Sequence, residues 1–360
     1  MDPGLIHEMT TKSDKHILII LVAGIGDLIM ASKSIRAMRN AFPDAYLHLL
    51  TSSEAAPIAA NYPYLDHVWN LPIRELRKDK FRILDMFRTA LRLRNFHFDS
   101  AVNLYRVMSY SGSLRMGLLF SLLKANINAG HDSKGFGIFL HKKAQAEIFQ
   151  NRHFVDAMMD IALLAGGVPD TGGIEVFWDQ GVEKTLEPLF QDDKLNSPAK
   201  IGINPGADRP EKRWDPQRYA SVADRLIENL GATIFILGGP GEESIASRIR
   251  GAMKHPATNL AGKLSLDGLA YMLSRLDLLI TNDSGPMHIG AAVKTPIVAL
   301  FGPEDPVYTR PYTSPHKYRI VQGRVPCRPC TRKKCEPPLC MQRVEPGEVL
   351  KACLELLNGQ

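Results

Sequence analysis

Short apolar runs alternate with amphipathic stretches along most of this chain. The runs are nearly continuous in apolar residues, which is typical of strands buried on both faces of a parallel sheet. Between them, apolar residues recur at helical spacing. The alternation predicts an α/β fold in which right-handed helical crossovers join parallel strands. The predicted strands are 16–23, 45–50, 67–71, 100–104, 127–129, 200–204, 233–237, the short apolar run that begins at Leu278, and 297–301.

The strand–helix pattern runs through the chain twice. At 360 residues the chain exceeds one domain of ordinary size. Residues 192–198 are polar and rich in helix breakers, which favours an interdomain linker. We therefore expect two Rossmann-like domains, 1–195 and 196–360. The second carries a cysteine-rich loop at 324–343 and a terminal helix at 347–357.

The most informative turn follows the apolar run that begins at Leu278. Ser284 can cap a following helix, Gly285 lets a ligand approach the backbone, and Pro286 suits the first helical turn. Free amides at such a helix start suit a phosphate or diphosphate, and His288 can add a donor. An ordinary capped strand-to-helix turn is the alternative.

An early turn, Gly24-Ile25-Gly26-Asp27, ends the first predicted strand. It is not a dinucleotide-binding fingerprint, because the third glycine would fall at Ile29. Asp27 has two interpretations: a structural N-cap, or a carboxylate that takes a proton from an attacking hydroxyl. The local sequence favours the cap.

Two further turns carry polar groups suited to a nucleotide. Asn204-Pro205-Gly206-Ala207-Asp208 precedes Lys212 and Arg213, either of which can clamp a diphosphate beyond the end of a strand. A flexible surface loop is the alternative. The turn at 238–241 precedes Glu242 and Glu243, which resembles a nucleoside-binding turn with a carboxylate for ribose hydroxyls.

Charge is concentrated in two segments. The net charge is 44 − 38 = +6, and residues 74–94 and 324–343 hold more than this excess. Such segments suit phosphorylated acceptors or anionic membranes, with solvated surfaces as the alternative. Nucleic acid is a poor fit, because stacking aromatics are not interleaved with the basic residues. Phe81, Leu84, Phe87 and Leu91 recur at helical spacing, and we expect this stripe to be core rather than a membrane anchor.

The longest apolar run, 17–23, is too short to span a bilayer and meets a glycine turn rather than a cleavage site. The expected compartment is therefore the cytoplasm.

Four of the five cysteines cluster near the C-terminus. The spacing Cys327-x2-Cys330-x4-Cys335-x4-Cys340 can bind zinc, or less readily an iron–sulfur cluster. Reduced thiols or a redox pair are the favoured alternatives. Cys353, in the terminal helix, is expected in the core.

Taken together, the ordered motifs resemble glycosyltransferase family 9, the heptosyltransferases of lipopolysaccharide core assembly. The residues that carry the resemblance are Gly26-Asp27, Asn204-Pro205-Gly206-Ala207, Lys212-Arg213-Trp214, Asn282 to His288, and the tail from Cys340-Met341 to Val344 and Pro346.

The resemblance implies a GT-B fold, with the donor in the C-terminal domain and the acceptor in the N-terminal domain. It implies inverting transfer from a nucleotide sugar, usually ADP-heptose, without a metal or other cofactor. Asp27 would be the general base and Lys212 would neutralise the leaving diphosphate, so the resemblance reverses the local interpretation of Asp27. The remaining donor-binding residues would be Gly206, Arg213, Glu242, Asp283, Ser284, Gly285 and His288.

The expected acceptor is a glycolipid of the lipopolysaccharide-core type, bound by Gly26, Arg88 and Arg92, with peripheral contact at the inner face of the cytoplasmic membrane. Members that act on lipid A–Kdo acceptors often carry a histidine in the first helix. Here that helix reads Leu28-Ile29-Met30-Ala31-Ser32, which leaves the acceptor's identity open.

Two alternatives stay open beside this reading. One is a transferase of the same fold that uses another nucleotide sugar on a different surface glycan. The other is a non-catalytic nucleotide-sugar-binding protein, against which Asp27 and Lys212 speak.

Overall fold

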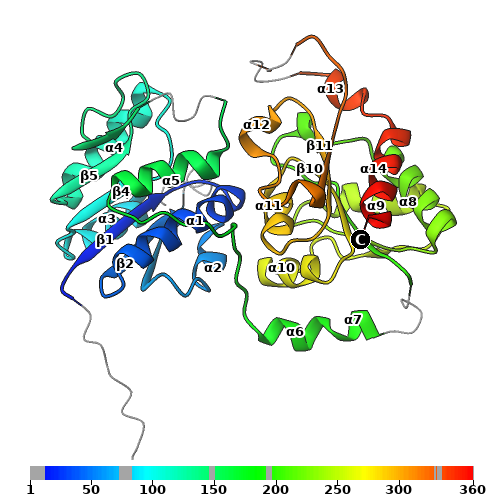
Figure 1. Ribbon diagram of the computed structural model, residues 1–360, viewed down its shortest axis with the longest axis horizontal. Helices are drawn as coiled ribbons and strands as arrows, with labels where there is room; N and C mark the ends of the chain where they lie inside the picture. The colour runs from blue at the N-terminus through cyan, green and yellow to red at the C-terminus, as the bar shows by residue number, and fades with distance from the viewer. Residues whose placement is uncertain are drawn as a thin grey trace, which may run out of the picture. The chain divides into compact units, whose positions relative to one another are not determined.

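The computed structural model describes residues 13–72, 83–145, 151–191, 197–327, 330 and 335–359, in two compact units (Figure 1). The first unit comprises residues 1–23, 33–150 and 156–171, and the second comprises 24–32, 151–155 and 172–360. Two helices therefore begin in the second unit and continue in the first. They are α1 (Ile25–Ala41) and α5 (Phe154–Leu164).

The first unit is built on a six-stranded parallel sheet of order β3-β2-β1-β4-β5-β6. Its central strand β1 pairs with both neighbours through Leu18, opposite His48 on one side and Ala101 on the other. The strands are β1 (His16–Leu21), β2 (Tyr46–Ser52), β3 (His67–Leu71), β4 (Ser100–Asn103), β5 (Ile127–His131) and β6 (Lys142–Ala144). The remaining helices are α2 (Ala56–Ala59), α3 (Ile83–Arg94) and α4 (Tyr110–Leu123).

The second unit repeats this topology, with a parallel sheet of order β12-β11-β10-β7-β8-β9. In each sheet the chain order therefore reverses beside the first strand, between β1 and β4 and between β7 and β10. Ligands of open α/β sheets bind beyond the carboxyl ends of strands at such a point. The strands are β7 (Lys200–Asn204), β8 (Thr233–Ile236), β9 (Thr258–Asn259), β10 (Leu278–Asn282), β11 (Ile297–Phe301) and β12 (Tyr318–Gln322).

Helices and short turns complete the second unit. They are α6 (Gly181–Leu186), α7 (Pro188–Gln191), the 3-10 turn η5 (Pro210–Lys212), α8 (Pro216–Leu230), α9 (Glu243–Ala252), α10 (Leu266–Ser274), α11 (Gly285–Ala292), α12 (Pro306–Thr309), η6 (Pro315–Lys317), α13 (Leu339–Gln342) and α14 (Pro346–Asn358). Asp215 caps α8 by accepting hydrogen bonds from the amides of Gln217 and Arg218. Gly231 ends the same helix in the left-handed conformation.

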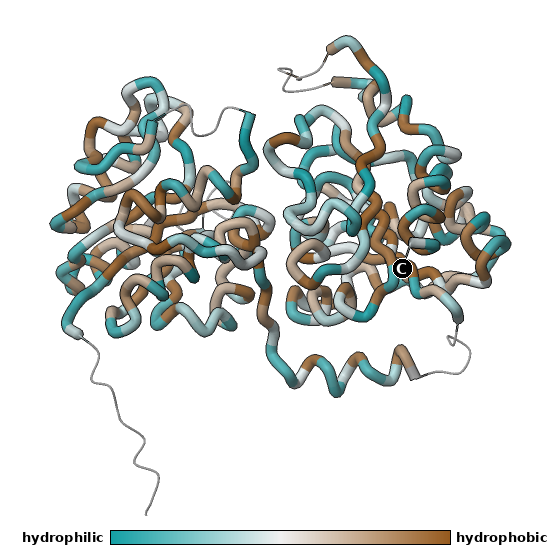
Figure 2. The backbone as a smooth tube through the Cα atoms, viewed as in Figure 1, coloured by the Kyte–Doolittle hydropathy of each residue, from teal (hydrophilic) through white to brown (hydrophobic). Residues whose placement is uncertain are grey.

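The most hydrophobic stretches lie in the central strands of each unit (Figure 2), where β1 and β10 are almost wholly buried. Cys353 of α14 is fully buried in the core of the second unit, as predicted. The predicted α/β class and parallel sheets are confirmed. The strands β6, β9 and β12 were missed. Strands β6 and β9 have only three and two residues, and β12 (YRIVQ) mixes polar with apolar residues instead of forming an apolar run.

The predicted buried stripe on α3 is wrong. Leu84, Phe87 and Leu91 are each more than half exposed, and Phe81 lies outside the described residues. The buried side of the helix instead carries Leu93, which is fully enclosed. Helical spacing showed that the helix has an apolar stripe, but it could not show whether anything covers it.

The segment that connects the two sheets packs on the second. The Trp178 ring contacts Tyr271 of α10 edge-on at 6.3 Å, and Phe190 of α7 contacts the same ring. Residues 172–191 therefore group with the second unit, whereas the sequence places the change at 195–196. The predicted linker, 192–198, lies mostly outside the described residues.

Candidate active site

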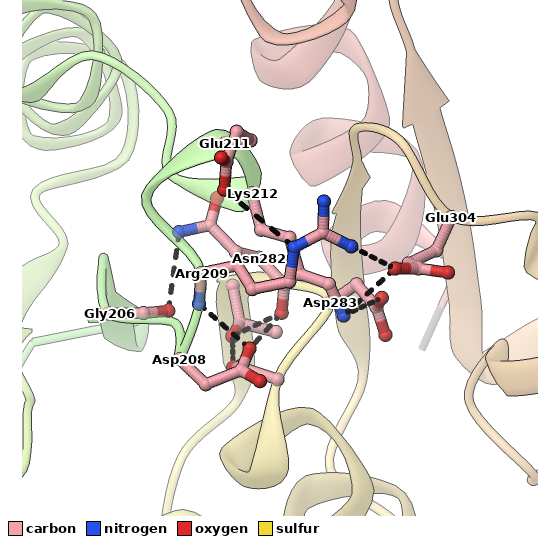
Figure 3. A network of polar contacts seen from close by, with 10 residues as sticks. Gly206, Asp208, Arg209, Glu211, Lys212, Asn282, Asp283 and Glu304 are labelled. Carbon is pink, nitrogen blue, oxygen red and sulfur yellow. Dashed lines mark hydrogen bonds and ion pairs between the residues drawn. The ribbon is translucent and has the colours of Figure 1, made fainter. Parts of the chain in front are cut away.

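A cluster of alternating charges lies beyond the carboxyl ends of β7 and β10 (Figure 3). Lys212 Nζ lies 2.9 Å from Asp283 Oδ2 and 3.8 Å from Glu304 Oε1. Arg209 Nη1 in turn lies 2.9 Å from Glu304 Oε1. Lys212 ends η5 and Asp283 directly follows β10, so the switch point of the sheet brings together two residues that are 71 positions apart.

Burial and ion pairing shift the pKa values of Lys212 and Asp283 in opposite directions. Burial alone would lower the pKa of Lys212, but the Asp283 and Glu304 carboxylates raise it overall. Burial raises the pKa of Asp283, and Lys212 opposes that rise. Lys212 is therefore a firmly held cation at neutral pH, and a diphosphate leaving group requires such a charge.

Asp27 lies in the first turn of α1, although not at the capping position proposed from the sequence. The amide of Leu28 donates to the Gly24 carbonyl at 3.1 Å, which makes Gly24 the N-cap residue. Asp27 is the third residue of the helix, and its Oδ2 accepts from the Gly24 amide at 3.2 Å. Burial raises the pKa of Asp27 to about 6, opposed by the Gly24 amide and Lys212. This is a carboxylate poised for proton transfer near neutral pH.

The start of α11 lies against the start of α1 within the second unit. A Cβ at position 26 would lie 2.8 Å from the His288 ring. A Cβ at position 285 would lie 3.7 Å from the Gly26 amide nitrogen. The two turns thus meet through their glycines. Ser284 occupies the N-cap position, but its hydroxyl donates to the Asn282 carbonyl at 3.2 Å, so the predicted side-chain cap is absent. The Met287 amide donates to the Ser284 carbonyl at 3.1 Å and Pro286 has no amide hydrogen, so Gly285 carries the amide that this turn can offer to a ligand.

His288 is 4% exposed, and its Nδ1 makes no hydrogen bond to the described residues. Burial lowers the pKa of His288 to about 3, with further lowering from His153 and Lys212. The ring is therefore neutral at physiological pH. A buried nitrogen without a partner is costly, so His288 offers a polar atom that a ligand can satisfy.

Gly206 and Glu242, which belong to two separate turns in the sequence, lie against each other in the structure. A Cβ at Gly206 would overlap the Glu242 carboxylate in its present position, so a larger residue there would require Glu242 to move. Glu242 is held by the Gly239 amide, which donates to its Oε2 at 2.8 Å. Glu242 and Arg213 also line a cavity of about 820 Å³, whose lining does not include Lys212 or Asp283. Arg213 braces its own loop, because its guanidinium donates twice to the Ala207 carbonyl.

Some residues of this region were not assigned roles from the sequence. Asn282 links three segments: its amide donates to Pro205 O at 2.8 Å, and its oxygen accepts from Tyr219 Oη at 3.0 Å and from the Trp214 amide at 3.3 Å. Glu304 follows β11, and its position just beyond a central strand was the one signal that could have identified it.

His153 was also missed. It is buried, and its Nε2 contacts the Arg310 carbonyl at 2.8 Å. No pattern in the sequence marks that contact, which spans 157 positions.

The remaining predicted residues lie elsewhere. Arg88 and Arg92 are exposed on α3 of the first unit, and Arg88 lies 3.5 Å from Asp85. The four clustered cysteines, Cys327, Cys330, Cys335 and Cys340, line a cavity of about 280 Å³. Within the described ranges, no three His, Cys, Asp or Glu side chains are arranged to hold a metal ion.

Two Rossmann-like units of the same strand order, with a cation–carboxylate cluster at the switch point of the second, are typical of the GT-B fold. Residues 86–340 match the model of glycosyltransferase family 9 (heptosyltransferase), and the chain belongs to that family.

Relatives and solved structures agree with this assignment. The chain is 26% identical to lipooligosaccharide heptosyltransferase 2 of Haemophilus influenzae over 86% of this chain and 90% of the relative. A family 9 glycosyltransferase from Veillonella parvula has a TM-score of 0.81 at 24% identity, over 97% of this chain and 98% of that one. The ADP-heptose LPS heptosyltransferase II of Escherichia coli has a TM-score of 0.74 at 22% identity, over 96% of this chain and 99% of that one. These two structures share its fold.

Proposed function

We propose that this enzyme transfers heptose from ADP-heptose to an acceptor of the lipopolysaccharide-core type, with inversion at the anomeric carbon. The observation that carries the proposal is the buried Asp27 carboxylate, with a pKa of about 6, in the same unit as the Lys212–Asp283 pair. A base and a fixed cation are what inverting transfer from a sugar diphosphate requires. The names of the relatives support heptose as the sugar and the lipopolysaccharide core as the acceptor.

The donor's charged half is assigned to the switch point of the second sheet. Lys212 supplies the positive charge for the leaving diphosphate, and the Gly285 amide at the start of α11 adds a donor. Ser284 and Gly285 form the start of that helix, and the open Nδ1 of His288 accepts from a donor hydroxyl or, as the other tautomer, donates to an oxygen. Glu242 has the carboxylate that ribose hydroxyls prefer, beside the glycine at 206.

The reaction then needs one proton acceptor. Asp27 takes the proton from the acceptor hydroxyl as its oxygen attacks the anomeric carbon, while the bond to the diphosphate breaks and ADP leaves. Because the carboxylate must be ionised, the rate falls as the pH drops below about 6. Lys212 does the work of charge neutralisation, so chelating divalent ions is expected to leave the rate unchanged.

The test is Asp27→Asn, with Asp44→Asn as a matched exposed control. We expect transfer by Asp27→Asn to fall roughly 100-fold to 10,000-fold, which is the range for loss of a general base. Calorimetric ADP binding should persist in Asp27→Asn and weaken in Asp283→Ala, which removes the carboxylate that positions the Lys212 ammonium group at 2.9 Å. Retention of full transfer activity by Asp27→Asn would sink the assignment of the base.

A donor panel separates this proposal from its nearest alternative. Transfer from ADP-heptose in preference to UDP- or GDP-sugars supports the proposal. Preference for another nucleotide sugar would retain the fold and the mechanism, but would assign the enzyme to a different glycan. Nucleotide-sugar binding without turnover, in the presence of a lipopolysaccharide-core acceptor, would contradict a catalytic role.

The proposal includes a place of action. A glycolipid acceptor would bring the enzyme to the inner face of the cytoplasmic membrane, with Arg88 and Arg92 as contacts for the acceptor's phosphates. None of the helices in the described ranges is long and apolar enough to cross a bilayer. Peripheral contact is therefore the form of membrane association that we propose.

A further inference from the structure

The exposed side of α3 is a row of large apolar side chains. Leu84, Phe87 and Leu91 follow the helical spacing i, i+3, i+7, and each is more than half exposed. The helix is nevertheless anchored, because Leu93 is fully buried and Met86 packs against the same core. The row is therefore the outer side of a docked helix, which the core of the first unit leaves uncovered.

The neighbouring helix α4 repeats this arrangement. Tyr110, Leu114 and Leu118 follow one another at four-residue spacing and are 84%, 76% and 57% exposed. Phe120 and Leu123 on the same helix are buried in the core that also encloses Leu93. Helices α3 and α4 pack against each other. Two packed helices thus each present an apolar row, and single exposed apolar residues do not explain such a pattern.

A loop beside α4 adds to the apolar surface. The ring of Phe139 stacks on Phe120 at 5.3 Å, and its edge lies 3.2 Å from where a Cβ at Gly117 would stand. The adjacent Ile138 is 80% exposed. We call the rows on α3 and α4, together with Ile138, the apolar face.

The charge on the same two helices has one dominant sign. α3 carries Arg88, Arg92 and Arg94, and α4 carries Arg115, all of them exposed. The single carboxylate in these two helices is Asp85, which lies 3.5 Å from Arg88. At 72% and 41% side-chain exposure this pair is weak, so it leaves the positive potential largely intact.

We propose that the apolar face docks on a membrane surface rich in anionic phospholipid. Leucine and phenylalanine side chains enter the boundary between headgroups and acyl chains, the tyrosine lies at the headgroup level, and the arginines meet lipid phosphates. The arginines are what favours a lipid surface over a protein partner, because each basic residue near an anionic leaflet adds about 1 kcal/mol. The inference deepens the proposed function and rests on it, because the proposed glycolipid acceptor would lie in a membrane.

The experiment is co-sedimentation of the full-length protein with vesicles, without donor or acceptor. Vesicles of phosphatidylglycerol and phosphatidylethanolamine are compared with vesicles of phosphatidylcholine alone. We expect binding to the anionic vesicles that weakens with added salt, and little binding to the neutral ones. Because neither substrate is present, a failure of the proposed heptosyl transfer would not affect this readout.

Two double variants test the two components. Leu114→Ser/Leu118→Ser removes two of the three apolar side chains of the α4 row and should weaken binding to anionic vesicles at least tenfold. Arg94→Glu/Arg115→Glu should weaken it by roughly fivefold or more per charge. Leu339→Ser and Arg225→Glu, exposed positions of the second unit, are the matched controls and should bind as the wild type does.

Activity provides the second readout. With a short, water-soluble acceptor, the Leu114→Ser/Leu118→Ser variant should keep the wild-type rate, whereas transfer to the same acceptor headgroup in anionic vesicles should fall.

Three results would overturn the proposal. The first is absence of vesicle binding by the wild type, and the second is equal binding to neutral and anionic vesicles. The third is a wild-type dimer in sedimentation velocity that becomes a monomer in the Leu114→Ser/Leu118→Ser variant. The last would identify a second copy of this chain as the occupant of the apolar face.

Discussion

The helix pair α3–α4 of the first unit and the pair α10–α11 of the second occupy the same place in the same strand order. In each sheet, the first helix follows the third strand and the second helix follows the fourth. Yet α10 is buried from Gly268 to Leu273 and α11 from Met287 to Ala291, whereas α3 and α4 each expose an apolar row. Topology alone therefore does not require the exposure.

The difference is traceable to what covers each pair. In the second unit α6 packs on α10. A Cβ built at Gly268 would lie 3.4 Å from the Leu186 side chain. Trp178 and Phe190 add ring contacts with Tyr271. The connecting segment thus forms an extra layer over α10. The described residues of the first unit show no equivalent layer over Leu84, Phe87 and Leu91, and an uncovered apolar row favours a partner.

The carboxyl ends of β4 and β10, which correspond in the two sheets, also differ in how many neighbouring segments they hold. β4 and β10 both end in asparagine. Among the described residues, the Asn103 side chain bonds within its own loop, to the carbonyl and the amide of Tyr105. Asn282 joins β10 to the loop after β7 and to Tyr219 of α8. The second unit therefore uses its switch point to hold several segments around a charged site.

The largest difference should appear in stability. Leu273→Ala in α10 removes a fully buried side chain and should cost about 2–5 kcal/mol of the unfolding free energy of the second unit. Leu118→Ala in α4 should change that of the first unit by less than about 0.5 kcal/mol. Urea unfolding followed by tryptophan fluorescence separates the units, because Trp69 is in the first, and Trp178 and Trp214 are in the second. Equal costs for the two variants would contradict the comparison.

Next in size is the charged site. Given the proposed function, Lys212→Met should lower transfer by roughly 100-fold to 1000-fold, since it removes the cation opposite the leaving diphosphate. Lys142→Met, an exposed lysine of β6, is the matched substitution in the first unit and should have no effect. Initial rates of ADP release measure both. A Lys212→Met enzyme with the wild-type rate would remove this site from the mechanism.

The two asparagines offer a smaller but closely matched test. Asn282→Ala leaves the buried Tyr219 hydroxyl without its acceptor and should lower the unfolding free energy of the second unit by about 1–3 kcal/mol. Asn103→Ala breaks only loop-internal bonds and should cost about 1 kcal/mol or less. The same urea titration compares them. Tyr219→Phe in the Asn282→Ala background should restore part of the loss, and failure to do so would weaken this explanation.

The remaining effect is that of pH on the stability of the second unit. Burial holds the pKa of His288 at about 3, well below its ordinary 6.5, so folding favours the neutral ring. Its contribution to stability is complete above pH 6.5 and is lost at about 1.4 kcal/mol per pH unit as the pH falls toward 3. His288→Gln should flatten this slope between pH 6.5 and 4. An unchanged slope in that variant would assign the pH dependence to other groups.

Local sequence patterns were sufficient for the architecture. The apolar runs around Leu18 and Ile280 predicted buried parallel strands because such strands need no polar face. Gly285 was identified as a close-approach point, and Gly26 and Gly206 as parts of candidate site turns; the structure places a side chain or backbone against each. These features could be predicted because each depends on residues close together in the chain.

Tertiary packing decided the rest. Helical spacing on α3 revealed an apolar stripe, but its exposure depends on whether a distant segment covers it. The sequence placed Asp27 at a helix start, but burial by the folded chain raises its pKa to about 6. The Lys212–Asp283–Glu304 cluster joins three loops that meet only because parallel strands deliver their carboxyl ends to one edge. Contacts between residues far apart in the chain exist only in the folded protein, where burial sets their energies.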